Sequence, residues 1–123
     1  VFNPEGRVLA VWNNIHRPDG LTLGGDGNIY IGELNGIDGG MTPLDHAPNL
    51  GHRVSIYSRD GELLARFGDP KEGEAPGQFI APHGIAVDSK GDIYVGEVAH
   101  VVRGRFWDPP RQPKSLKKFR RLP

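Results

Sequence analysis

An internal repeat constrains the fold of this chain more than any other feature of its sequence. Residues 18–33 read PDGLTLGGDGNIYIGE and residues 82–97 read PHGIAVDSKGDIYVGE, so seven of sixteen positions are identical at an offset of 64. A second pair, residues 1–12 and residues 56–67, aligns at an offset of 55. Repeats of this kind indicate similar structural units that pack against their neighbours and share a continuous core.

Each unit is made of short apolar runs separated by turn residues, in a chain of 123 residues with 18 Gly and 11 Pro. Asp60-Gly61 lies between two such runs and is a strong hairpin signal. No helical periodicity of useful length is found, so we predict an all-β chain. The predicted strands are residues 20–23, 28–32, 53–58, 62–67, 84–87, 92–95 and 115–120. Four antiparallel strands with apolar residues on both faces describe a β-propeller blade, which packs on a neighbour at each face.

The same segments resemble a known family. GQFIAPHGIAVDSKGDIYVGE (77–97) and HRVSIYSRDGELLARFG (52–68) are similar to NHL repeats, and Pro82-His83-Gly84 resembles bacterial proteins grouped with peptidyl-α-hydroxyglycine amidating lyase. The resemblance covers nearly the whole chain, and SLKKFRRLP resembles the usual end of that family. It implies a six-bladed propeller, of which this chain is about the last third, with lyase-like or ligand-binding activity in a central channel. Because the lyase site also needs tyrosine and arginine partners from earlier blades, the resemblance implies that these 123 residues alone are inactive.

Counting strands gives about two blade equivalents in a single propeller-fragment domain, residues 1–123. Residues 1–12 are expected to supply the outer strand of a shared blade, residues 16–68 a complete four-stranded blade, and residues 79–123 the first three strands of the shared blade. The spare strand of one copy can complete the sheet of the next, and three copies then give six blades as a homotrimer. The alternative is a lone two-blade fragment, which would expose apolar faces and an unpaired sheet edge.

His83 is the sharpest candidate for a functional residue, because it precedes the strand nearest a propeller's central channel. The resemblance implies that histidines in this position point into the channel and bind zinc, and three imidazoles with an open fourth position form a catalytic zinc pattern. The corresponding residue of the other unit is Asp19. A homotrimer would alternate three His83 with three Asp19, whose carboxylates would orient the rings. The alternative is that His83 is a turn residue hydrogen-bonded to a neighbouring blade.

Glu33 and Glu97 end the second strand of their units, where the family more often has Asp that hydrogen-bonds the next turn. A structural role is expected for both, and ligand binding at the propeller mouth is the alternative. The resemblance likewise implies that Arg53 braces an adjacent acid. The remaining histidines lie in connecting segments and are expected to be solvated: His16, His46, His52 and His100.

Charge is unevenly distributed although the formal net charge is zero. Residues 101–123 hold eight Lys or Arg against Asp108 alone, whereas the first hundred residues hold seven basic and fourteen acidic residues. Such a basic end is typical of a nucleic-acid-binding tail, or it docks against acidic surface of the same assembly. The resemblance to NHL propellers also implies the alternative function, a protein- or RNA-binding platform.

The long connections at 34–51 and 98–114 are the least regular parts of the chain, and loops of this length are often functional. Trp107 in the second connection is expected to cap a blade face, or to stack on bases beside Arg103 and Arg105. There is no Ser-His-Asp elbow and no phosphate-binding loop. No stretch approaches the roughly 20 apolar residues of a membrane span, so no membrane partner is expected. A small molecule or peptide remains a candidate ligand for the channel.

Overall fold

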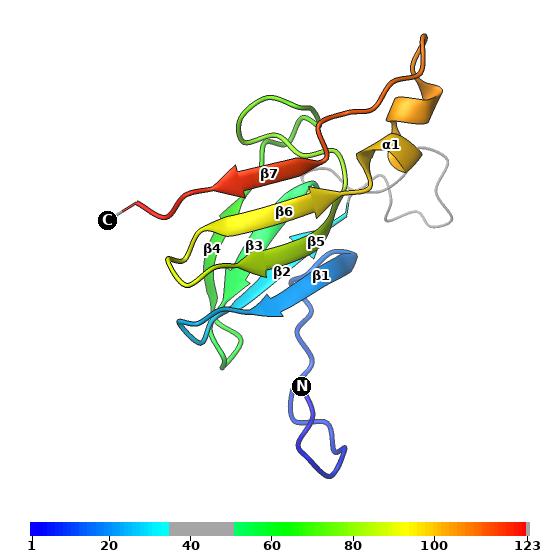
Figure 1. Ribbon diagram of the computed structural model, residues 1–123. Helices are drawn as coiled ribbons and strands as arrows, with labels where there is room; N and C mark the ends of the chain where they lie inside the picture. Colours follow the sequence, from blue (N-terminus) through cyan, green and yellow to red (C-terminus); the bar gives the residue numbers. More distant parts are fainter. Residues whose placement is uncertain (35–50, 123) are drawn as a thin grey trace.

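The computed structural model describes residues 1–34 and 51–122, which form two antiparallel sheets and one short helix (Figure 1). The first sheet contains β1 (Pro18–Leu23), β2 (Ile29–Glu33), β3 (Arg53–Tyr57) and β4 (Leu63–Phe67), and the second contains β5 (Pro82–Val87), β6 (Ile93–Glu97) and β7 (Leu116–Phe119). Strands adjacent in the sequence are neighbours in each sheet, in the orders β1-β2-β3-β4 and β5-β6-β7. The predicted all-antiparallel β architecture and its strand order are thus confirmed.

The first two strands of each sheet are equivalent in register, as the repeat predicts. Pro18 pairs with Glu33 and Gly20 with Gly32, with a bulge between the two pairs. In the second sheet, at an offset of 64, Pro82 pairs with Glu97 and Gly84 with Gly96, again with a bulge between the two pairs. The third strands also match, because Val54 of β3 and Leu116 of β7 lie opposite equivalent glycines of β2 and β6.

The hydrophobic core lies between the two sheets, where β5 packs against β1 and β2. Because side chains alternate across a strand, each sheet has one face turned to this core and one turned away. We call these the contact face and the outer face. The contact faces carry Tyr30, Val54, Ile56 and Phe67 from the first sheet, and Ile85, Val87, Ile93, Val95 and Phe119 from the second. Phe79, in the connection between the sheets, is fully buried among them.

One part of the described chain differs from the prediction, and another stays a prediction. Within the single chain, residues 7–12 form no strand, and Phe2 and Val8 make only an isolated bridge. The outer strand expected from residues 1–12 belongs to a blade shared between copies, so it stays a prediction. The second connection contains a four-residue helix, α1 (Ala99–Val102), and a 3-10 turn at Gly104–Phe106, although no helix was predicted. A single turn is too short to give a helical period in the sequence. No helix among the described residues is long and apolar enough to cross a membrane.

Candidate functional site

Two β-bulges position the residues that sequence analysis ranked first. Asp19 is the extra residue of the bulge in β1, and His83 is the extra residue of the equivalent bulge in β5. A bulge bends the strand and re-aims a side chain, and bulges occur preferentially beside functional sites. The sequence therefore places one acid and one imidazole at the same position of two adjacent strands.

The two side chains meet, because His83 Nε2 lies 3.1 Å from Asp19 Oδ2. The strands can approach this closely because Gly20 has no side chain: a Cβ there would collide with the carbonyl oxygen of His83. About half of the His83 side chain and a third of the Asp19 side chain remain exposed, so the pair is accessible to a ligand.

This pair supplies an imidazole with one nitrogen engaged by a carboxylate. A carboxylate that holds one ring nitrogen fixes the orientation of the imidazole and makes its other nitrogen a better metal ligand or base. One chain does not make a complete metal site in the part that the structure describes, since no three His, Cys, Asp or Glu side chains cluster there. The pair alone therefore does not form a metal site among the described residues.

Glu33 and Arg53 lie apart from this pair, inside the first sheet. Glu33 is fully buried, and its Oε2 accepts bonds from Arg53 Nε at 3.0 Å and Arg53 Nη2 at 2.8 Å. Its other oxygen accepts from the hydroxyl of Ser55, and its Oε2 also accepts from the backbone N–H of His16 at 2.7 Å. These contacts join β2 and β3 to the segment before β1, as expected for a structural acid braced by an arginine.

Glu97 has the equivalent position in the second sheet but a different cation. Its Oε2 accepts from the backbone N–H groups of Ile80 and Ala81 at 2.5 and 2.8 Å, and its Oε1 lies 2.5 Å from Lys117 Nζ. Sequence analysis missed Lys117, which occupies the position of Ser55 when β7 is aligned with β3. That alignment was available in the sequence, and it places a cation beside a buried carboxylate.

The histidines of the connecting segments have different environments. The prediction that His52 is solvated is wrong: its side chain is buried, and its Nδ1 lies 2.8 Å from the carbonyl oxygen of Ile80. Burial lowers the pKa of His52, and this outweighs the opposite effect of the bond to Ile80. His52 has a positive φ of 49° immediately before β3, a conformation that sequence patterns do not reveal. His16 and His100 are both half-buried, and His100 Nδ1 lies 3.3 Å from the carbonyl oxygen of Arg111. His46 lies outside the described residues, as does most of the connection at 34–51.

The basic end of the chain is largely neutralised by acids of the same chain. Five of its eight cations lie within 4.0 Å of a carboxylate, in the pairs Arg103–Glu72, Arg111–Glu74, Lys117–Glu97, Lys118–Asp92 and Arg121–Asp26. The bond from Arg111 lowers the pKa of Glu74 to about 2, and the bond from Lys118 lowers the pKa of Asp92. Trp107 packs in a small cluster with Ile80 and Ala99, and its ring centroid lies 4.1 Å from the Arg111 guanidinium carbon. Most of these cations are thus already engaged, as expected for a basic end that docks on acidic surface.

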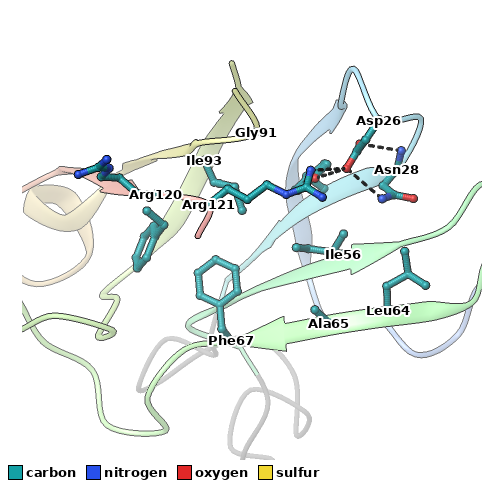
Figure 2. Close-up of a pocket in the computed structure, with 12 residues that line it drawn as sticks. Asp26, Asn28, Ile56, Leu64, Ala65, Phe67, Gly91, Ile93, Arg120 and Arg121 are labelled. Atoms are coloured by element: carbon teal, nitrogen blue, oxygen red, sulfur yellow. Dashed lines mark hydrogen bonds and ion pairs between the residues drawn. The ribbon is translucent and has the colours of Figure 1, made fainter. Parts of the chain in front are cut away.

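A groove of about 400 Å³ lies between the two sheets near their last strands (Figure 2). Its floor is mostly apolar, and Arg121 reaches across it to lie 3.8 Å from Asp26. The apolar lining residues are Ile56, Leu64, Ala65 and Phe67 from the first sheet and Ile93 and Phe119 from the second. Sequence analysis did not identify this groove, because it depends on how two sheets meet.

Comparison with known proteins adds no assignment: the chain matches no protein-family model and no curated protein.

Proposed function

We propose that the two sheets are adjacent blades of an NHL-type β-propeller, and that the chain is a binding module whose ligand site is the Asp19–His83 pair. The observation that carries this proposal is the pair of equivalent bulges that bring Asp19 and His83 to 3.1 Å on the first strands of both sheets. In a propeller the first strand of each blade lies closest to the central channel. Both residues would therefore face a common channel.

Three copies would give the six blades that the resemblance implies, with three His83 and three Asp19 alternating around the axis. Three imidazoles can hold a divalent zinc ion and leave a fourth position for a ligand. Each Asp19 would fix the ring of a neighbouring His83, as the pair inside one chain already does at 3.1 Å. A small molecule or peptide with a donor atom for the metal is the class of ligand that this arrangement suits.

The alternative of an RNA-binding platform has less support. Lys and Arg side chains bind RNA when they neutralise its phosphates and displace the counterions bound there. Five of the eight cations of the basic end are instead paired with carboxylates of the same chain. Trp107 is packed against α1 and Arg111 instead of standing open for base stacking.

Zinc binding by the full chain tests the proposal. We expect one zinc per three chains by elemental analysis after gel filtration, with nitrogen ligands at about 2.0–2.1 Å by X-ray absorption. His83→Ala should abolish binding, and Asp19→Asn should weaken it by about 10–100-fold because it removes the orienting carboxylate. His100→Ala is the matched control, since His100 is a half-buried histidine of α1, away from the inner strands, and it should bind zinc as the parent chain does. A chain that takes up no divalent metal, or a His83→Ala variant that retains it, would overturn the metal site.

A further inference from the structure

The outer edges of the two sheets are not equivalent. In the first sheet β3 is covered by β4, whereas β7 pairs only with β6 among the described residues. The free edge of β7 presents backbone N–H and C=O groups that can pair with another strand.

The first residues of the chain repeat the turn that leads into β4. Asn3 N–H donates to the carbonyl of Arg7 at 3.0 Å, as Ser58 N–H donates to that of Glu62 at 2.9 Å. Both turns have a glycine at the same place, with φ of 81° at Gly6 and 87° at Gly61. Residues 7–12 therefore leave their turn as β4 leaves its own, at the offset of 55 found in the sequence.

An aromatic contact is repeated as well. Phe67, at the end of β4, packs on Phe119 of the second sheet with ring centroids 5.0 Å apart. Trp12 aligns with Phe67, and it stacks on Tyr57 of the first sheet with ring centroids 5.5 Å apart. Tyr57 in β3 is equivalent to Phe119 in β7. Trp12 thus lies on the outer face of the first sheet as Phe67 lies on the second sheet. Figure 1 shows the first residues projecting from the first sheet on the side away from β5–β7.

The outer face of the second sheet has a glycine at the position where the two sheets approach most closely in the internal interface. Gly20 on the contact face of the first sheet is in close contact with the backbone of His83, whereas a Cβ added to the equivalent Gly84 would meet no atom within 4 Å. The outer face of the first sheet, in turn, exposes the apolar side chains of Leu21 and Leu23, which correspond to Ile85 and Val87 in the internal interface. The two outer faces therefore reproduce the two halves of the interface that already joins the sheets.

The groove beside β7 has an apolar lining that matches the apolar side chains of residues 7–12. Val8 and Val11 align with Leu63 and Arg66, which lie on the outer face of the first sheet. The equivalent face of the second sheet is its contact face. On a strand beside β7, Val8 and Val11 would therefore face the first sheet across the groove. Both side chains are exposed in the single chain, at 59% for Val8 and 72% for Val11. Burying them against the apolar lining of the groove would remove this exposure from water.

We infer that residues 7–12 of a second copy of this chain pair with the free edge of β7 and complete its sheet, so that copies join head to tail. This inference rests on the blade assignment proposed above and names the partner that completes the assembly. The register follows from the first sheet, where Ile56 pairs with Ala65, and it places Ala10 of one copy opposite Lys118 of the next. Such head-to-tail contacts between identical chains close into a ring when the rotation permits it.

An engineered disulfide tests this pairing. The chain has no cysteine, so Ala10→Cys combined with Lys118→Cys introduces the only two thiols. Directly opposed residues of antiparallel strands have Cα atoms about 4.5–5.5 Å apart, which suits a disulfide. After mild oxidation we expect cross-linked multimers on a non-reducing gel, at least about tenfold more abundant than in the control, and lost on reduction. Ala10→Cys with Lys90→Cys is the matched control, because Lys90 lies in the exposed turn between β5 and β6.

Cross-linked multimers that appear equally in the control, a disulfide within one copy, or free monomer alone would each overturn the pairing. The result is separable from the zinc measurement. Cross-linking without zinc uptake would remove the metal site and leave the pairing, whereas zinc held by His83 without cross-linking would remove the pairing and leave the site.

Discussion

The two sheets begin alike and end differently. The first two strands of each share register and bulge, and they place Asp19 beside His83. Their outer parts diverge: the first sheet has β4, from which Arg66 Nε donates to Ser55 at 2.8 Å and Arg66 Nη2 approaches Glu33 at 3.8 Å. The second sheet has no strand beyond β7 among the described residues, and Lys117 of β7 itself meets the buried Glu97.

This difference suggests that the inner and outer strands have different roles. The repeated inner strands carry the candidate ligand site, because its geometry depends on the bulges and on the close approach at Gly20. The outer strands carry the surface that we propose pairs with a second copy. Lys117 of β7 already pairs with Glu97, so a strand that docks beside β7 need not supply a cation as β4 does with Arg66. Val11, which aligns with Arg66, is an uncharged residue at this position.

The largest predicted effect comes from removing the charge of the buried acids. Glu33→Gln takes the carboxylate away from the buried Arg53 guanidinium, and we expect a loss of about 3–5 kcal/mol in unfolding free energy, measured by urea denaturation. Glu97→Gln should cost less, about 1–3 kcal/mol, because Lys117 Nζ also donates to the carbonyl of Gln78 at 2.6 Å. Equal losses for the two variants would contradict the difference between the sheets.

A smaller effect should distinguish the two equivalent glycines. Gly20→Val forces a side chain into the backbone of β5, so we expect a loss of about 1–3 kcal/mol and a lower thermal midpoint. Gly84→Val meets no atom of its own chain, and it should keep the β-sheet circular dichroism spectrum while reducing the solution mass. Gly25→Val, in an open turn, is the control for adding the same side chain where nothing is within 4 Å. An unchanged mass for Gly84→Val would show that this face is not covered by another copy.

The smallest effect is a pH dependence centred on His52. Because burial lowers its pKa from the ordinary value of 6.5, the unfolded chain binds more protons near that pH, and stability falls as pH drops through 6.5. Glu72 and Glu97 oppose this effect and Arg103 adds to it. The thermal midpoint should therefore be lower at about pH 5.5 than at about pH 7.5, and His52→Gln should flatten this difference. A midpoint that rises on acidification would contradict the assignment.

Sequence analysis predicted the strands and their order because a repeat aligns each inner hairpin with its copy. It also singled out Asp19 and His83 as equivalent residues, and the distance of 3.1 Å between them followed only from the packing of β1 on β5. Local patterns could not reveal the burial of His52 or the groove between the sheets, since both depend on contacts between segments far apart in the chain. The outer strand expected from residues 1–12 stays a prediction, because its expected partner lies in another copy and the single chain offers only the bridge between Phe2 and Val8.

Solution mass is the most direct test of the claim that one copy completes the sheet of another. Gel filtration with multi-angle light scattering should give three times the chain mass of 13.5 kDa for the full chain. A variant that lacks residues 1–11, and so keeps Trp12 on Tyr57, should elute as a folded species with the mass of one shortened chain. A full chain that is well folded and monomeric at 13.5 kDa, even in concentrated solution, would contradict the account.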